Sequence, residues 1–378
     1  MRSLLFCNEM LGLGHLGLSL ALAEALVADE ESTALVVTGS PAFGGMRVTR
    51  RVDLLKLPTL PVDAESQWSG TELRPRAHLA LTSDQVSALR SQISLATARE
   101  FRPQVVVVDY RPLGRNDELV RTLEWLKQQG DCTIALGLWE VDDSADRLRR
   151  TWTADLLGSV RDLYDLALVY GPSPPGDLRI EGLRSVGVPI HHTDFVAASR
   201  AEHGPSDIPG PYLLVSAGGG IDGFALLEAV IGAIQLRPLR LPTVLVAGPM
   251  MPTDQVDRLR SGAVGIDVRV EHVRPDMDEV LAGAQAVVSM AGYCTVAEIL
   301  SSGKPALLVP RAAPREEQLN RARRLAAAGR VDMLDPRAAG PTELRQAIDR
   351  LLDRPPVVQE SPTGATDAAA ILTRSPRK

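Results

Sequence analysis

Two runs of alternating strand-like and helix-like segments limit the folds open to this chain of 378 residues. Short apolar, β-branched stretches such as 105–110 and 133–139 alternate with stretches whose apolar residues recur every three or four positions. This alternation predicts parallel sheets with helices on both faces. It breaks at 187–210, which is rich in Pro, Gly and polar residues, and then restarts. We therefore expect an α/β fold with two doubly wound domains.

The break also sets the expected domain boundaries. We predict a Rossmann-like domain over 1–190, a connection over 191–210, and a second Rossmann-like domain over 211–354. The last segment, 355–378, is expected to be a loose tail with a short helix that returns to the first domain. Two such domains facing each other would enclose a cleft at the carboxyl ends of both sheets, where open α/β folds bind ligands.

Composition excludes several classes of partner. The 41 basic and 47 acidic residues are interspersed and give a net charge of −6, which argues against a nucleic-acid partner and against a polybasic membrane patch. The three cysteines form no C-x-x-C pair, which indicates free thiols in a cytoplasmic protein without zinc. No stretch reaches the roughly 20 uninterrupted apolar residues of a transmembrane helix, and glycines interrupt the apolar segment 3–27.

Residues 12–17, GLGHLG, follow the first strand-like run and match the spacing G-x-G-x-x-G. A nicotinamide-binding domain also needs an acidic residue at the end of its second strand, where it holds the ribose hydroxyls. The second run ends in VVTGSPAFGG and contains no Asp or Glu. A dehydrogenase is therefore disfavoured.

Histidine 15 gives this loop another possible chemistry. Gly12 and Gly14 permit a sharp turn, and His15 at the start of the following helix is placed to act as a general base near neutral pH. A purely structural hydrogen bond is the alternative. Asp109 ends the four-valine strand at the same edge, where it could orient His15 or accept from a substrate hydroxyl. It could equally cap its own turn, and the sequence leaves both open.

The stretch AVVSMAGYCTVAEIL reads as a strand, a glycine turn and a helix. Backbone N–H groups of residues 292–295 at such a helix start favour an anion. Thr295 could add its hydroxyl, and Glu298 could accept from the vicinal hydroxyls of a ribose. The spacing T-x-x-E is also that of a capping box, in which the pair only satisfies the helix's own end.

Four motifs in order, VRPDM, SMAGYCTVAEIL, GKPALLVP and REEQLNRA, resemble the donor half of glycosyltransferase family 28, of the MurG type. The resemblance is good over 210–335 and thinner over the amino half, where GLGHLGLSLALAEAL is similar to the family's glycine loop. It implies the GT-B fold, with an acceptor-binding first domain and a nucleotide-sugar-binding second domain.

The resemblance also implies roles for individual residues. Val273 or Arg274 would meet the nucleotide base, Glu298 the ribose, and Glu317 with Gln318 the donor sugar. Glu317 stands where the family has glutamine, and a carboxylate cannot donate, which argues against an N-acetyl sugar. The diphosphate would lie against two glycine-containing turns formed by Ala291, Gly292, Tyr293, Cys294 and Thr295 and by Ser216, Gly218, Gly219 and Gly220.

These parts predict metal-independent, inverting sugar transfer without a cofactor. Helix-end N–H groups would stabilise the leaving diphosphate, and no D-x-D motif stands on an expected loop, since Asp276 and Asp278 begin a helix. The expected substrates are a nucleotide-diphosphate sugar, with UDP favoured, and an acceptor alcohol that is a natural product, a saccharide or a lipid-linked saccharide. The alternatives are a sugar-nucleotide 2-epimerase and a catalytically silent binding subunit.

Overall fold

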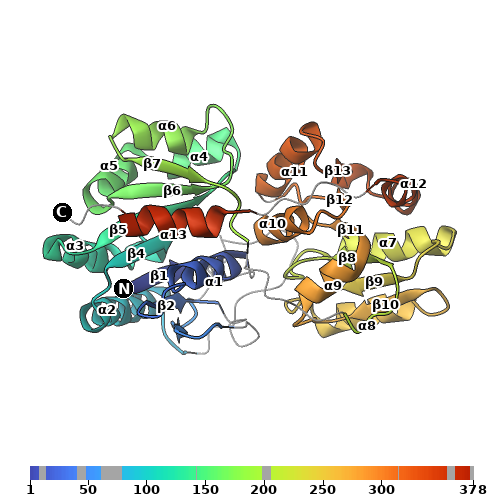
Figure 1. The fold of residues 1–378 in the computed structure, drawn as a ribbon, viewed down its shortest axis with the longest axis horizontal. Coiled ribbons are helices and arrows are strands. Elements are labelled where there is room, and N and C mark those ends of the chain that lie inside the picture. The colour runs from blue at the N-terminus through green and yellow to red at the C-terminus, as the bar shows by residue number, and fades with distance from the viewer. Residues whose placement is uncertain are drawn as a thin grey trace. The chain divides into compact units, whose positions relative to one another are not determined.

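The computed structural model of the chain forms two compact units, which are described separately (Figure 1). The first unit holds the described residues up to 197 together with a helix near the carboxyl terminus, and the second holds those from 206 to 355. The structure describes residues 1–7, 14–40, 48–60, 79–141, 143–197, 206–313, 315–355 and 362–374.

The first unit is built on a seven-stranded parallel sheet in the order β3-β2-β1-β4-β5-β6-β7. Its central strands are buried from end to end because helices cover both faces, and a run such as VVVVD satisfies that environment. The strands are β1 (Arg2–Cys7), β2 (Thr33–Thr38), β3 (Val52–Lys56), β4 (Val105–Asp109), β5 (Thr133–Trp139), β6 (Leu166–Tyr170) and β7 (Ile190–Thr193).

Helices connect these strands, and their apolar faces complete the core of the first unit. The α-helices are α1 (Gly14–Leu26), α2 (Ser83–Phe101), α3 (Val120–Gln129), α4 (Ala145–Thr151), α5 (Ala154–Leu163) and α6 (Leu178–Ser185), and a 3-10 turn spans Arg115–Asp117. Helix α2 begins with a capping box in which Thr82 accepts from the backbone N–H of Gln85.

Helix α13 (Gly364–Arg374) returns to the first unit and packs along α1 and against β7. Its first residue, Gly364, lies so close to the chain after β7 that a Cβ atom there would be 2.1 Å from the carbonyl oxygen of Asp194. Strand β7 itself extends the first sheet into the range expected to be the interdomain connection. Its sequence IHHT carries exposed histidines, because an edge strand needs little apolar surface.

The second unit contains a six-stranded parallel sheet in the order β10-β9-β8-β11-β12-β13. The strands are β8 (Tyr212–Ser216), β9 (Thr243–Val246), β10 (Val268–Glu271), β11 (Ala284–Ser289), β12 (Ala306–Leu308) and β13 (Asp332–Met333). The helices are α7 (Phe224–Leu236), α8 (Thr253–Gly262), α9 (Met277–Gly283), α10 (Tyr293–Ser302), α11 (Glu317–Ala327) and α12 (Pro341–Leu352), with a 3-10 turn at Pro336–Ala338. None of the helices in the described part of the chain is long and apolar enough to cross a membrane.

Each sheet reverses its winding once. In the first unit the reversal lies between β1 and β4, and in the second it lies between β8 and β11. The carboxyl ends of two adjacent strands diverge at such a switch point, and the loops that follow them leave in opposite directions. The predicted catalytic residues and the predicted diphosphate site lie at or just after the ends of these four strands, whereas Val273 and Arg274 follow β10, and Glu317 and Gln318 follow β12.

Candidate active site

The switch point of the first unit joins His15 to Asp109. His15 is the second residue of α1, Asp109 is the last residue of β4, and both side chains are buried. The Nδ1 atom of His15 lies 2.5 Å from Oδ2 of Asp109. Because Nδ1 faces the carboxylate, Nε2 is the nitrogen that a substrate could approach. Gly14 is the residue directly before His15, whereas Gly12 lies outside the described residues.

Two aromatic rings enclose the imidazole of His15. The ring of Trp139 stacks on it, with centroids 4.0 Å apart and planes inclined by 15°. The ring of Tyr110 lies tilted, with its centroid 5.3 Å away. Neither residue could be recognised from the sequence, because each is an ordinary aromatic at the end of a buried strand.

The switch point of the second unit is formed by a glycine turn after β8. Gly218 and Gly220 have positive φ values of 60° and 90°, and the N–H of Gly218 donates to Oγ of Ser216 at 3.2 Å. Gly248, in the turn after β9, supports the loop so closely that a Cβ atom there would lie 2.3 Å from the carbonyl oxygen of Gly218. Only glycines allow the two turns to approach in this way.

Helix α10 begins at the same switch point. Its N-cap is Gly292, no side chain caps it, and its first turn contains no acidic residue. Thr295 is therefore the third residue of the helix, and the capping-box alternative for the Thr295–Glu298 pair is wrong. A Cβ atom built on Gly218 would lie 3.4 Å from Oγ1 of Thr295, so the glycine turn and the helix start face each other. The backbone N–H groups of the α10 start and the Thr295 hydroxyl thus lie beside the turn after β8.

Glu298 lies one turn further along α10 and is only partly exposed. Burial raises the pKa of its carboxyl to about 8, and the negative charge of Asp278 on α9 acts in the same direction. A carboxyl in this state exchanges its proton near neutral pH. It can therefore donate to or accept from a hydroxyl group.

Glu317 and Gln318, both predicted to hold the donor sugar, have different surroundings at the start of α11. Glu317 is buried and forms an ion pair with Arg311, which also binds Asp222 at 2.9 Å. The side-chain oxygen of Gln318 accepts from the backbone N–H of Arg311 at 3.2 Å. Arg311 thus ties the β8–α7 loop to the start of α11, a role that sequence reasoning missed.

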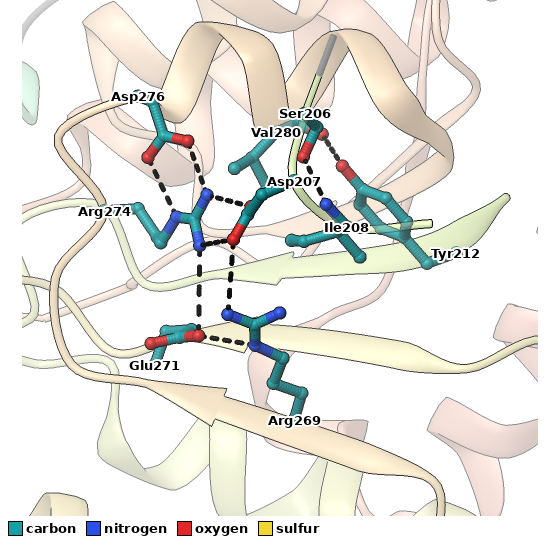
Figure 2. A network of polar contacts seen from close by, with 9 residues as sticks. All are labelled: Ser206, Asp207, Ile208, Tyr212, Arg269, Glu271, Arg274, Asp276 and Val280. Atoms are coloured by element: carbon teal, nitrogen blue, oxygen red, sulfur yellow. Dashed lines mark hydrogen bonds and ion pairs between the residues drawn. The ribbon is translucent and has the colours of Figure 1, made fainter. Parts of the chain in front are cut away.

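Val273 and Arg274, predicted to meet the nucleotide base, follow β10. The Val273 side chain is 47% exposed, whereas Arg274 binds Asp207 and Asp276 (Figure 2). Both ion pairs hold the pKa of Arg274 above its usual range. Asp207 precedes β8, so this network fastens the entry of the unit to the loop after β10.

Arg321 of α11 supports the turn that precedes α10. Its side chain is 1% exposed, donates to the carbonyl oxygen of Ala291 at 2.9 Å, and lies over the ring of Tyr293 at 5.4 Å. No sequence signal distinguishes it, because α11 carries three other charged residues, Glu317, Arg323 and Arg324. Cys294, the next residue of α10, is partly exposed and forms no disulfide.

A cavity of about 550 Å³ opens at the carboxyl ends of β6 and β7, the same edge of the first sheet that carries His15. The loop 172–176, the start of α6 and residues 192–194 line it. Among the residues that the structure describes, no cluster of three or more His, Cys, Asp or Glu side chains is arranged to hold a metal ion.

Comparison with solved structures defines the class of fold. The glycosyltransferase of kitacinnamycin superposes with a TM-score of 0.66 at 19% identity and covers 99% of this chain and 98% of its own. Acinetobacter baumannii MurG superposes with a TM-score of 0.59 at 14% identity, covering 99% of both chains. The chain therefore adopts the α/β GT-B fold, as the sequence predicted.

The similarity to a known protein family covers the carboxyl half of the chain. Residues 214–372 match the model described as the glycosyltransferase family 28 C-terminal domain. A Mesorhizobium japonicum protein named UDP-N-acetylglucosamine–N-acetylmuramyl-(pentapeptide) pyrophosphoryl-undecaprenol N-acetylglucosamine transferase is 30% identical over 208 residues, 52% of this chain and 55% of the relative. The resemblance to family 28 is confirmed, and this part of the chain carries that domain. The chain spans about half the length of the curated relatives it matches.

Proposed function

We propose that this protein is an inverting glycosyltransferase that moves a sugar from a nucleotide-diphosphate sugar, with UDP favoured, to an acceptor hydroxyl. The observation that carries the proposal is the start of α10, where an uncapped helix end faces the glycine turn after β8. The match of residues 214–372 to a family 28 C-terminal domain supports the same activity.

The leaving diphosphate is assigned to this helix start. Negative charge develops on the diphosphate oxygen as the anomeric bond breaks, and N–H groups already directed at that position stabilise it without rearrangement. The Thr295 hydroxyl, which lies beside the Gly218–Gly220 turn, adds a further donor. Arg321 fixes the turn that precedes α10 by donating to the carbonyl oxygen of Ala291.

The acceptor is assigned to the first unit, with His15 as general base. The acceptor hydroxyl gives its proton to Nε2 of His15 while its oxygen forms the bond to the anomeric carbon. The bond from that carbon to the diphosphate oxygen breaks, so the configuration inverts. Asp109 fixes the imidazole through Nδ1 and stabilises the imidazolium formed by proton transfer.

The nucleotide and the sugar are assigned to neighbouring groups of the second unit. Glu298 receives the ribose hydroxyls, and the backbone at the exposed Val273 meets the base. Because Arg311 engages the carboxylate of Glu317, we assign the sugar hydroxyls to Nε2 of Gln318. Glu317 would then act on the sugar only by holding Arg311, whose backbone N–H donates to the side-chain oxygen of Gln318.

We also propose that the transfer is independent of metal ions. Its support is the helix end at α10, which supplies to the diphosphate the charge stabilisation that a metal ion supplies in other enzymes. Asp276, one of the two acidic residues spaced as D-x-D, is bound to Arg274. Chelation with EDTA should therefore leave turnover unchanged.

A ribose test separates this site from other modes of nucleotide binding. Calorimetry on the full chain should show UDP binding more tightly than 2′-deoxy-UDP by about tenfold, the worth of one good hydrogen bond to a carboxylate. Glu298→Gln should reduce that ratio toward one. Glu279→Gln, on the neighbouring α9, is the matched control and should retain it. Equal affinities for both nucleotides in the wild-type chain would contradict the assignment of Glu298.

Turnover separates the transferase from its alternatives. A 2-epimerase converts a UDP-sugar with no acceptor present, whereas a transferase consumes it only with an acceptor alcohol. His15→Ala should lower transfer by about 10²–10⁴, the usual contribution of a general base, and leave UDP affinity unchanged. Absence of donor turnover with saccharide, lipid-linked and natural-product acceptors, despite UDP binding, would favour the silent binding subunit.

The class of the acceptor is to be assigned by experiment. The Mesorhizobium relative is named for a lipid-linked acceptor, and the kitacinnamycin enzyme is named for a natural product. A panel of both acceptor classes with one UDP-sugar, read by mass spectrometry of the product, is the experiment that assigns it.

A further inference from the structure

Trp139 lies against His15 in a way that its place in the strand does not require. It is the last residue of β5, and strand geometry only directs its side chain to one side of the sheet. The indole nevertheless lies nearly parallel to the imidazole, at 4.0 Å between centroids. A Cβ atom on Gly14 would lie 3.9 Å from the same ring, so the indole packs along the start of α1.

The backbone of Trp139 is firmly anchored. Its carbonyl oxygen accepts from Nη2 of Arg179 at 3.0 Å. Arg179 is fully buried and forms an ion pair with Asp177 at 2.6 Å. A buried pair of this kind holds one geometry, because both partners lose more by separating than exposed ions would. The indole is therefore mounted on a rigid support.

Tyr110 gives an independent sign that the structure favours this arrangement. It has a φ of 65°, a left-handed conformation that residues with a Cβ atom rarely adopt. Its N–H donates to the carbonyl oxygen of Gly137 at 2.8 Å, which holds the strained turn. The turn brings its ring to 5.3 Å from His15. Strain of this kind persists where surrounding contacts determine it and is common at functional sites.

These contacts fix both the Nδ1 side and the plane of the imidazole. Asp109 holds Nδ1, and Trp139 determines the plane of the ring. With both fixed, the direction in which Nε2 points is fixed as well. A general base needs this, because proton transfer depends on alignment with the acceptor hydroxyl.

Groups from several strands surround the His15–Asp109 pair. Asp109 on β4 is the charged group in contact with it, and Cys7 of β1 lies beside Asp109 in register. Tyr170 of β6 stays neutral, since burial and the charge of Asp109 both raise its pKa well above its ordinary value. The indole face adds attraction for a cation, and tryptophan is the strongest of the aromatic residues in this respect.

We propose that Trp139 is a positioning residue for the His15 base, acting through its stacked indole to align Nε2 and to stabilise the imidazolium formed by proton transfer. The proposal rests on the proposed function for its catalytic meaning. The contact itself can be tested without turnover.

The test compares Trp139→Leu and Trp139→Phe in the full chain. Loss of the indole should lower kcat by about 10- to 100-fold, the cost of a misaligned group, while KM for the donor changes less than about twofold. Trp139→Phe keeps a ring to stack and should recover most of that loss. Trp125→Leu, on α3 and away from His15, is the matched control and should leave kcat unchanged.

Titration of His15 by NMR provides a readout that would not change if Trp139 had only a structural role. The chain has six histidines, and the His15 signal is assigned by its absence in His15→Gln. In Trp139→Leu the pKa of His15 should fall, since leucine keeps the site apolar but offers no π face. The acid limb of the pH–kcat profile should move to lower pH with it, and Trp125→Leu should change neither.

The outcomes distinguish failure of the Trp139 proposal from failure of the proposed function. A His15 titration identical in Trp139→Leu and wild type overturns the proposal, and so does a loss of kcat that Trp139→Phe does not recover. A wild-type chain that turns over no donor contradicts the proposed function only. In that case a lowered His15 pKa in Trp139→Leu still supports the stacking contact.

Discussion

Glu298 links ligand chemistry to stability through a single carboxyl group. Its pKa is about 8 in the folded chain, against an ordinary value of 4.5, because burial disfavours the charged form. Below pH 4.5 both folded and unfolded chains hold the proton. Between pH 4.5 and 8 only the folded chain holds it, so the stabilisation present at low pH is lost as pH rises through that range.

Glu298→Gln should remove this pH dependence. The melting temperature of the wild-type chain relative to the variant should fall steadily from pH 5 to pH 8 and level off above that, since the glutamine amide does not titrate. Thermal melts of both chains over pH 5–9 measure it. A constant difference across this range would show that the carboxyl is not protonated in the folded state.

Arg321 makes a second prediction at the scale of one residue. Replacing its buried guanidinium in Arg321→Met leaves the carbonyl oxygen of Ala291 without that donor, which should cost about 1–3 kcal/mol of unfolding free energy. Because Ala291 precedes the α10 turn, UDP affinity should fall as well.

Arg323→Met on the exposed side of the same helix is the control for Arg321→Met, and surface changes of this kind cost within about 0.5 kcal/mol. Chemical denaturation and calorimetry with UDP read both effects. UDP affinity equal in the two variants would show that Arg321 stabilises the unit without shaping the turn.

Site residues at the ends of recognisable strands could be predicted from the sequence, whereas residues whose partners are distant along the chain could not. His15 and Asp109 each follow a recognisable strand, and the carboxyl ends of parallel strands meet at one edge. Trp139, Arg311 and Arg321 reach their partners with long side chains, and those partners lie 124, 89 and 30 residues away in sequence. Such pairs leave no local spacing to recognise.

Among the elements, the paired turns after β8 and β9 depend on glycine. Gly248→Ala places a Cβ atom 2.3 Å from the carbonyl oxygen of Gly218 and also strains a residue with a φ of 95°. The β8 turn should shift, and with it the contact between Gly218 and Thr295 of α10. We expect lowered stability and weakened UDP binding.

Gly265→Ala separates strain from collision. Gly265 has a φ of 82°, but no atom lies within 4 Å of its Cβ position. It should cost only the strain of a left-handed residue, about 1–2 kcal/mol, and leave UDP affinity unchanged. The difference between the two variants, measured by denaturation and calorimetry, isolates the contact between the turns. Equal UDP affinity in both would show that the β8 turn tolerates displacement.

Element types were predictable where apolar runs are long. The buried strands β1, β4, β5, β8 and β11 match apolar runs in the sequence, because strands buried on both faces read as continuous hydrophobic stretches. Strand β7 escaped prediction because its IHHT sequence lies at an edge and stays polar.

At the scale of the whole molecule, the two units repeat one topology and differ in the groups at their switch points. The first places a histidine–aspartate pair between β1 and β4. The second places backbone N–H groups and a hydroxyl between β8 and β11. The first set suits proton transfer and the second suits an anion. A substitution that perturbs the first unit should therefore affect proton transfer from the acceptor. One that perturbs the second unit should affect the binding of the nucleotide diphosphate.

Helix α13 allows that separation to be tested. It belongs to the first unit although it follows the second in sequence, and it buries Ala368, Ala369 and Leu372 against that unit. Gly364→Leu would drive a side chain into the backbone at Asp194 and Phe195 and should release the helix. Since α13 packs along α1, which carries His15, transfer should fall strongly.

The described core of the second unit is built from residues 213–352, so UDP affinity should survive in Gly364→Leu. Gly158→Leu is the matched control, because no atom lies within 4 Å of its Cβ position on α5. Calorimetry with UDP and acceptor-dependent turnover, measured on both variants, give the two readings. A parallel loss of UDP binding and transfer in Gly364→Leu, with neither in Gly158→Leu, would show that the helix stabilises the donor half too, and that the two switch points do not act independently.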